Sequence, residues 1–548
     1  MKTAALGALL LAGHAALLVA LARRPAPTFE LTVAAPPASA TLTLDAEVPP
    51  ALRARVQHVP DGLPPSAPGL RRVRWRAEYR GGHERSVGAS QLVGPFQDPA
   101  APPCSARVII GQALLDDGAA GPGTLAHLVR QLLAAELATV GQFPIGDFGG
   151  VRALSLRWSQ LAHHPEDAAM LGQAPELREA SAGYLRAAAE VSFERVDVPV
   201  VLGFVPTVQG GQLQLRVVAR ARLAFGNRLA QWLSDHLGGD QLASSLTRRQ
   251  LGEVLRTQLE PPPPLPLPGG GQLRFAPCGA PQIAEGAYGA LPFSVAIDPL
   301  PGSPLHLPPL LAPLLAPPLA PLLTPSDAPW PTATVGATPL ALELSLDALN
   351  AILYGAWRHG LLDRQLAAAG LVEKLHADPL VATYLSLRLT APRLTLPPVL
   401  TAHQGGLRLA AESATTVRDG ATSTLGRVWT AVQVSTASGT SADAGPALRA
   451  QLAELELTCE PRPHVLSPCY ADLVAAVRDR RAEFTAPLTN ALSRLVTELF
   501  SRRTIGTAEL PAELLVRSAA PSLRVGAGGP ADATLRLDLT TELQISAP

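Results

Sequence analysis

One short segment of the sequence gathers side chains that can ligate a metal ion. His163 and His164 are followed by Pro165, Glu166 and Asp167. Imidazole and carboxylate groups are common ligands of zinc and related ions. Adjacent histidines on a turn broken by proline do not easily face one ion, however. We therefore favour a solvated loop over a metal site and expect the protein to hold no metal.

Sequence motifs for catalysis are absent. The chain contains no Gly-x-Ser-x-Gly nucleophile elbow, no P-loop and no His-Glu-x-x-His zinc motif. The three glycines at 269–271 follow a run of prolines and open no helix, so we interpret them as a turn and not as a phosphate cradle. We expect a protein that is not an enzyme and that needs no cofactor.

Arginines alternate with apolar residues from Arg72 to Arg80. In a strand, Arg72, Arg74 and Arg76 share one face while Val73 and Trp75 share the other. Such a row can contact anionic lipid headgroups. It can equally form the solvated outer face of an edge strand, which is the interpretation we favour. Arg72, Arg74 and Arg76 remain candidates for headgroup contact.

The chain has 4 cysteines, which allow three disulfide connectivities. Cys459 and Cys469 flank a Pro-rich turn, so neighbourhood favours a local pair. Cys104 would then pair with Cys278 and close a long loop across the first half. Disulfides persist outside the cytoplasm, which suits an exported protein.

Residues 1–24 have the pattern of a secretory signal peptide. Lys2 precedes an apolar run, Ala20-Leu21-Ala22 is a small-x-small cleavage pattern, and Arg23 follows. The run also approaches the ~20 residues that span a bilayer, so an uncleaved membrane anchor is the alternative. In both cases we expect the bulk of the chain on the non-cytoplasmic side, whether secreted, periplasmic or membrane-anchored.

Length and composition narrow the function further. At 548 residues the chain is too long for one core, which predicts two domains. Hydrophobic residues make up 47% and charged residues only 16%, which suggests an interior surface shielded from water. The 45 basic and 45 acidic residues balance, which argues against nucleic acid as a partner. The sequence says nothing of the oligomeric state.

The stretch Leu342–Leu362 predicts a short strand end that runs into an amphipathic helix. Ser345 suits the N-cap, and Gly360 suits the left-handed residue that ends the helix. Apolar residues recur at three- and four-residue steps, namely Leu346, Leu349, Ile352, Leu353, Ala356 and Trp357.

Around this helix the two halves of the chain repeat one order of elements. Each contains helices and long stretches that alternate at period two, as half-buried strands do. Further helices are predicted at 124–140, 226–260 and 470–500, the last kinked at Pro487. Residues 301–335 are Pro-rich and predict an extended linker between a first domain at 25–300 and a second at 336–548.

The segment Leu344–Leu362 resembles the opening helix of the second domain in the bactericidal/permeability-increasing and lipopolysaccharide-binding protein family. The matching positions are Ser345, Asn350, Tyr354, Gly360 and Leu361. Leu349 stands where that family usually has Phe, and the Pro-rich approach is longer than the family's linker. The chain is also neutral, whereas the antibacterial members carry a strongly basic first-domain tip.

The resemblance implies the tubular lipid-binding superfamily and an α+β fold of two tandem elongated domains, each a long curved antiparallel sheet wrapped around a long helix. It implies an exported lipid-binding or lipid-transfer protein whose partners are a phospholipid or other acyl lipid and a membrane surface. The alternative is a structural or interaction protein of the cell envelope with filled cores. The candidate lipid contacts are Leu349, Ile352, Leu353, Ala356, Leu488, Leu492 and Leu495.

Overall fold

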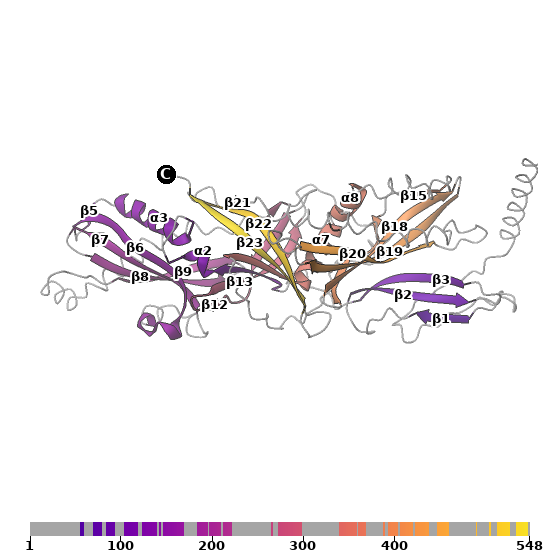
Figure 1. Ribbon diagram of the computed structural model, residues 1–548, viewed down its shortest axis with the longest axis horizontal. Coiled ribbons are helices and arrows are strands. Elements are labelled where there is room, and N and C mark those ends of the chain that lie inside the picture. Colours follow the sequence, from indigo (N-terminus) through magenta and orange to yellow (C-terminus); the bar gives the residue numbers. More distant parts are fainter. Residues whose placement is uncertain are drawn as a thin grey trace, which may run out of the picture.

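The computed structural model is an elongated arrangement of antiparallel sheets (Figure 1). It describes residues 55–59, 69–78, 84–93, 104–118, 123–139, 142–143, 146–168, 183–194, 197–209, 212–221, 265–266, 272–298, 339–358, 360–368, 387–389, 393–403, 406–419, 422–437, 447–459, 489, 504–505, 512–525 and 533–545. Along the long axis a five-stranded sheet occupies one end, a nine-stranded sheet the centre, and a six-stranded sheet with a three-stranded neighbour the other end.

The five-stranded sheet forms one end of the molecule. Its strands are β5 (Gln142–Phe143), β6 (Gly146–Gln160), β7 (Gly183–Phe193), β8 (Asp197–Gln209) and β9 (Gln212–Ala221), in that order. Leu154, Leu156 and Trp158 alternate along β6 and face a buried cluster. Helices α2 (Gln112–Leu115) and α3 (Leu125–Thr139) contact β6. Thr124 caps α3 by accepting the His127 N–H at 3.4 Å, as its sequence predicted.

The nine-stranded sheet lies at the centre and contains strands from both halves of the chain. Its order is β10 (Leu265–Pro266), β11 (Gln272–Pro277), β13 (Tyr288–Asp298), β4 (Ala106–Gly111), β14 (Leu340–Ser345), β23 (Ala533–Ile545), β22 (Ala512–Val525) and β21 (Thr504–Ile505), with β12 (Gln282–Ala284) paired to β13. Because β4 pairs with β14, the sheet continues across the predicted domain boundary. The two halves therefore share one sheet.

The two faces of the central sheet differ in chemistry. Leu340, Leu342 and Leu344 of β14 face an apolar cluster that Leu537 and Leu539 of β23 also join. Residues between these leucines face the opposite side, where cross-strand pairing aligns Glu343 with Arg107 on β4 and with Arg536 on β23. These three charged residues are all at most 3% exposed.

The six-stranded sheet forms the other end with long paired strands. Its strands are β15 (Leu387–Leu389), β16 (Arg393–Leu394), β17 (Val399–His403), β18 (Gly406–Asp419), β19 (Thr422–Ala437) and β20 (Ala447–Cys459). β15, β16 and β17 each pair with β18, which continues to β19 and β20. A register shift between Ala431 and Val432 marks a bulge where β19 meets β20.

The three-stranded sheet of the N-terminal part packs on this distant end. It consists of β1 (Arg55–Val59), β2 (Gly69–Glu78) and β3 (Glu84–Val93), with β2 in the middle. β2 contacts β17 and β18, and β3 contacts β20. Leu70 of β2 is buried in a cluster with Val399, Ala410 and Trp429. Strands that open the chain thus lie beside strands that follow residue 390 (Figure 1).

Helix α7 (Leu346–Arg358) follows β14 directly and ends where its sequence predicted. Ser345 caps it by accepting the Ala348 N–H at 3.3 Å. Gly360 has φ 66°, a left-handed conformation that glycine adopts without strain. Helix α8 (Leu361–Ala368) begins at the next residue.

The predicted α+β fold class is wrong. The described residues are mostly strand, and their four α-helices are short, the longest having 15 residues. No described helix runs through a sheet that wraps around it. Gly360 ends α7 after 13 residues, so this helix is too short to run the length of either sheet that it contacts. The protein is mainly an assembly of antiparallel sheets.

Cys104 and Cys278 form a disulfide with Cα atoms 5.8 Å apart, which confirms that predicted pair. Cys104 lies two residues before β4, and Cys278 directly follows β11, so both cysteines lie beside central-sheet strands from the first half of the chain. A disulfide is compatible with a non-cytoplasmic location. The second predicted pair cannot be compared, because Cys469 lies outside the described residues.

Several sequence predictions concern residues that the structure does not describe. These are the N-terminal segment 1–24, the linker 301–335, the helix 226–260 and nearly all of the helix 470–500 with Leu488, Leu492 and Leu495. None of the helices in the described ranges is long and apolar enough to cross a membrane.

Candidate functional site

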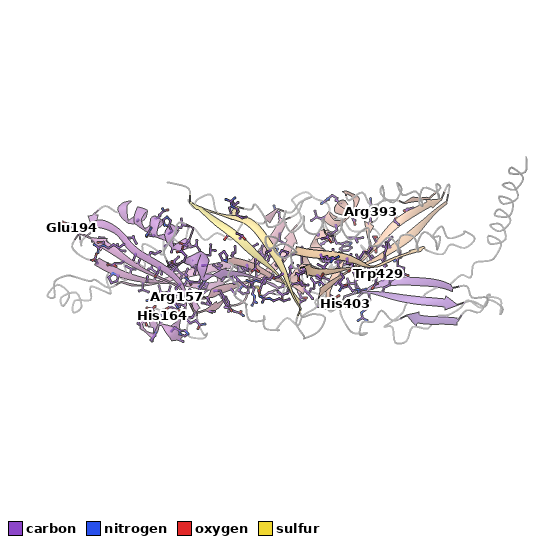
Figure 2. The ribbon with its side chains drawn as sticks, in the orientation of Figure 1. Arg157, His164, Glu194, Arg393, His403 and Trp429 are labelled. Carbon is purple, nitrogen blue, oxygen red and sulfur yellow. A yellow bond between two sulfur atoms is a disulfide. The ribbon has the colours of Figure 1, made fainter. Side chains whose placement is uncertain are left out.

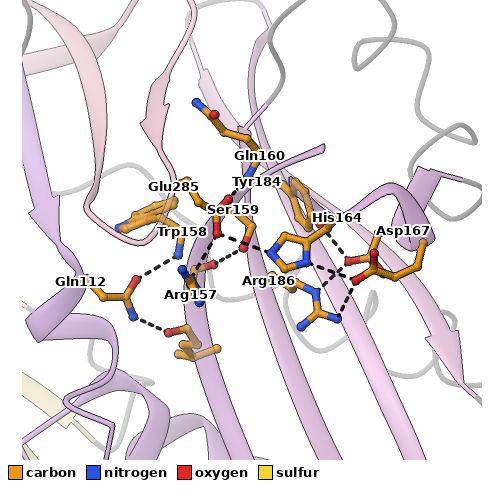
Figure 3. Close-up of polar contacts among 12 residues, drawn as sticks. Gln112, Arg157, Trp158, Ser159, Gln160, His164, Asp167, Tyr184, Arg186 and Glu285 are labelled. Atoms are coloured by element: carbon orange, nitrogen blue, oxygen red, sulfur yellow. Dashed lines mark hydrogen bonds and ion pairs between the residues drawn. The ribbon is translucent and has the colours of Figure 1, made fainter. Parts of the chain in front are cut away.

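A polar cluster lies where the five-stranded sheet meets the β12–β13 hairpin of the central sheet (Figure 3). We call it the His164 cluster and define it as His164, Glu166, Asp167, Arg186 and Glu285. After β6, His164 lies between two short 3-10 turns, Leu161–His163 and Pro165–Asp167, and Glu166 and Asp167 lie on the second turn. Arg186 projects from β7, and Glu285 lies in the turn between β12 and β13.

Asp167 forms the buried base of the His164 cluster. Its side chain is 0% exposed, and its Oδ2 accepts hydrogen bonds from the Tyr184 hydroxyl and the Arg186 Nε, both at 2.8 Å. Burial raises the pKa of the Tyr184 phenol, and the hydrogen bond to Asp167 raises that pKa further. Tyr184 therefore remains a hydrogen-bond donor to the carboxylate at neutral pH.

His164 lies between two carboxylates. Its Nδ1 is 3.2 Å from Glu166 Oε1, and its Nε2 is 3.4 Å from Glu285 Oε1. Glu285 also pairs with Arg157 at 3.2 Å. A backbone hydrogen bond and then the hydrogen bond with His164 lower the pKa of Glu166, so this exposed carboxyl stays ionised.

The His164 cluster has the ligand types of a metal site, but the guanidinium of Arg186 already lies beside its carboxylates. The ligand atoms of His164, Glu166 and Asp167 lie within 4.8 Å of one another. Arg186 is 2.8 Å from Asp167 and 3.9 Å from Glu166, so a divalent ion would sit beside a guanidinium. The arrangement fits an ion-pair network better than a metal centre. It also differs from the solvated loop that we expected, since Asp167 is fully buried.

Further hydrogen bonds show that this region joins two sheets (Figure 3). The Gln160 N–H donates to Glu285 Oε2 at 2.6 Å, and the Gly286 N–H donates to the Trp158 carbonyl at 2.8 Å. The Trp158 indole N–H donates to the Ile110 carbonyl of β4 at 2.9 Å. The cluster and these bonds hold the five-stranded sheet against the central one, which is a structural role.

The second candidate site is helix α7, where the structure places four predicted lipid contacts. Ala356 is buried, whereas Leu349, Ile352 and Leu353 are only half-buried. Leu349 packs against two clusters, one on the central sheet and one on the six-stranded sheet. The apolar side of α7 thus lies at the junction of two sheets and is incompletely covered.

The more polar side of α7 is the better-buried one. Asn350 is 1% exposed and bonds the Leu400 backbone in both directions, at 3.0 and 2.8 Å. The Trp357 indole N–H donates to the Leu394 carbonyl at 3.2 Å. These contacts hold α7 to β16 and β17 through its polar groups. Tyr354 is also buried, and among the described residues its hydroxyl has no hydrogen-bond partner.

Arg72 differs from the solvated or headgroup-binding residue that we expected. It is 3% exposed, pairs with Glu456 at 3.1 Å, and stacks 5.6 Å from the ring centroid of Trp429. The physical reason is that β2 is the middle strand of its sheet and packs on another sheet. The side chains of Arg74 and Arg76 lie outside the described set.

The His164 cluster lies toward one end of the molecule, where Figure 2 shows Arg157 and His164 on the side that also carries Glu194. Helix α7 lies nearer the centre, where it contacts the central and the six-stranded sheets (Figure 1). The chain matches no protein-family model and none of the curated proteins. The candidate sites therefore have to be judged on their own geometry.

Sequence reasoning missed the polar groups that surround the buried Trp429. Arg72 and Arg408 both approach its ring, and its indole N–H donates to Glu454 at 3.0 Å. The available signal was the alternation of Leu and Glu in residues 454–457, which marks a strand with one charged face. That alternation did not show that the Arg72 side chain would cover this face.

Proposed function

We propose that the protein is an exported lipid-binding or lipid-transfer protein. The observation that carries the proposal is helix α7, which buries its polar groups and leaves Leu349, Ile352 and Leu353 half-buried at a junction of two sheets. A globular protein normally places such residues in its core. An acyl chain would complete their burial.

The driving force would be removal of apolar surface from water. Each methylene of an acyl chain that becomes buried contributes about 0.8 kcal/mol. The two apolar clusters against which Leu349 packs, which include Leu342 and Leu400, would supply further apolar surface for an acyl chain. Lipid would be sequestered there after extraction from a membrane, with no chemical step. The high apolar content and the resemblance of residues 344–362 to a lipid-binding family support the same function.

Export is part of the proposal. The disulfide between Cys104 and Cys278 and the signal-like residues 1–24 both support a secreted, periplasmic or membrane-anchored protein on the non-cytoplasmic side. The competing function is a filled scaffold of the cell envelope, in which α7 contacts no lipid.

A lipid-recovery experiment tests the function. Delipidated protein is incubated with envelope lipids, repurified and analysed by mass spectrometry for bound lipid. We expect near-stoichiometric recovery from the wild type and at least a tenfold lower recovery from Ile352→Asn, because an amide there raises the cost of burying an acyl chain.

Leu161→Asn is the matched control, because Leu161 is a half-buried apolar residue beside a small cluster of the five-stranded sheet. It should bind lipid as the wild type does. Recovery of no lipid by the wild type would exclude the transfer function and favour the scaffold. Equal losses in both variants would remove α7 from the binding site.

A further inference from the structure

His164 lies between two carboxylates that belong to different parts of the fold (Figure 3). Its Nδ1 is 3.2 Å from Glu166, which follows β6, and its Nε2 is 3.4 Å from Glu285, in the turn between β12 and β13. A neutral imidazole has one N–H donor and one nitrogen that only accepts, whereas an imidazolium has two donors. Because both ring nitrogens face carboxylate oxygens, only the imidazolium satisfies both contacts.

The charges around the imidazole also favour its protonated form. Among the described residues, the His164 cluster brings together three carboxylates and the guanidinium of Arg186, and Arg157 of β6 adds a second guanidinium 3.2 Å from Glu285. Arginine keeps its charge at every pH at which proteins are normally studied. An imidazolium at His164 supplies a third positive charge and balances this group.

Histidine is the side chain that ordinarily changes its charge between pH 5 and 8. Two neighbours of His164 keep their protonation states in that range. A backbone hydrogen bond and then the hydrogen bond with His164 lower the pKa of Glu166, so this carboxyl stays ionised. Burial and the hydrogen bond to Asp167 raise the pKa of Tyr184 on β7, so this phenol stays protonated. The imidazole is therefore the group through which pH acts on the cluster in this range.

Glu285 connects the imidazole to main-chain hydrogen bonds of the junction. Its Oε2 accepts the Gln160 N–H of β6 at 2.6 Å. The next residue, Gly286, donates its N–H to the Trp158 carbonyl of β6 at 2.8 Å. Both amides thus span the gap between β6 and the β12–β13 turn, and their exchange with solvent reports how often this turn separates from β6.

We propose that His164 makes the contact between the five-stranded sheet and the β12–β13 hairpin dependent on pH. At about pH 6 and below, the imidazolium bridges Glu166 and Glu285 and holds the turn against β6. At about pH 8 the neutral ring donates to one carboxylate only, and its unprotonated nitrogen faces the other. The charge pairing of Glu285 among the described residues then rests on Arg157, and the turn opens more often. Proton binding and docking of the turn thus favour one another.

Amide hydrogen exchange of the full-length protein at about pH 6, 7 and 8 tests this proposal. Each rate is divided by the intrinsic exchange rate at the same pH, so that the protection factor reports opening alone. In the wild type we expect the protection of the Gln160 and Gly286 amides to fall at least about threefold from pH 6 to pH 8. Protection in β18 and β19, at the other end of the molecule, should stay constant.

The variant His164→Gln should show protection that does not change with pH, because its amide is uncharged over the whole range. His163→Gln is the matched control, because His163 is the exposed neighbour on the preceding turn. It should keep the wild-type profile. Glu285→Gln is a second test: it removes the carboxylate on the hairpin but keeps an oxygen that can accept the Gln160 N–H, and it should flatten the profile as well.

Three outcomes would overturn the proposal. Constant protection of both amides in the wild type would show that the turn does not respond to pH, and rising protection toward pH 8 would reverse the assigned direction. A profile that falls in His164→Gln or in Glu285→Gln as it does in the wild type would assign the effect to another group. The proposal does not depend on lipid binding, because lipid recovery is tested through Ile352 on α7, and the two can fail independently.

Discussion

At the scale of single residues, the central sheet buries one glutamate, Glu343, between two arginines, Arg107 and Arg536. Glu343 accepts from Arg107 at 2.5 Å and from Arg536 at 3.0 Å, and Arg536 also donates to Asp538 at 2.7 Å. Removing charges from water costs several kcal/mol per ion, which close pairing must offset. Glu343 is the anion that both arginines share, so it is the residue on which this group depends.

Replacing Glu343 by Gln should destabilise the protein by about 3–5 kcal/mol, because two buried guanidinium groups would lose a common counter-charge. Urea unfolding followed by circular dichroism measures this change. The triple variant Arg107→Leu, Glu343→Leu and Arg536→Leu removes all three charges together and should recover much of the loss. A Glu343→Gln variant within about 1 kcal/mol of the wild type would show that the arginines do not need this carboxylate.

At the scale of elements, α7 is set by its two ends and by the strand before it. Ser345 caps the first turn, and Gly360 ends the helix with a left-handed conformation. Since α8 starts at Leu361, the turn at Gly360 also sets the direction of the next helix. Asp363 of α8 then accepts the Leu394 N–H at 2.9 Å, so β16 is held by both helices.

Gly360→Ala should lower stability by about 1–2 kcal/mol, because an L-residue is strained in the left-handed region. Gly123→Ala is the control: its φ is not positive, and a Cβ there would meet no atom within 4 Å. The control should change stability by less than about 0.5 kcal/mol. Urea midpoints at constant m-value give both numbers, and similar values for the two variants would contradict the assigned role of Gly360.

At the scale of the whole molecule, strands β2 and β3 are tied to the six-stranded sheet, more than 300 residues later in the chain. Arg72 and Ser90 are cross-strand neighbours on β2 and β3. Arg72 pairs with Glu456, and Ser90 donates a hydrogen bond to Glu412. Glu412 and Glu456 flank Trp429 in the register of the six-stranded sheet. Arg72 and Ser90 of the three-stranded sheet therefore contact a cross-strand row of the six-stranded sheet that consists of Glu412, Trp429 and Glu456.

Arg72→Met should loosen this docking, because it removes a buried ion pair and leaves Glu456 without that partner. We expect at least tenfold faster amide hydrogen exchange in β2 and β3, with unchanged exchange in the five-stranded sheet. Arg152→Met is the control, since its ion pair with Asp197 is 60% and 39% exposed and contributes little. Unchanged exchange in β2 after Arg72→Met would mean that apolar contacts around Leu70 suffice for docking.

Much of the local structure could be predicted from the sequence, because local patterns have local causes. The period of three to four residues and the two end residues predicted α7, and Thr124 with its leucines predicted α3. Neighbourhood favoured the local pair Cys459–Cys469, and Cys104 with Cys278 followed as the remaining pair, which the structure contains. The fold class failed because periodicity does not show how far a helix runs or what surrounds it.

Sequence by itself determined α3, α7 and strands with clear alternation such as β23, because side-chain spacing depends on the backbone period alone. It did not indicate β3, β4, β6 or β22. Only the tertiary structure decided which strands became neighbours. Arg107 and Glu343 are 236 residues apart in the chain, yet pairing of β4 with β14 brings them into contact. The same long-range packing buried Arg72 and left Leu349 half-covered, because burial depends on what another segment covers, and no local pattern records that.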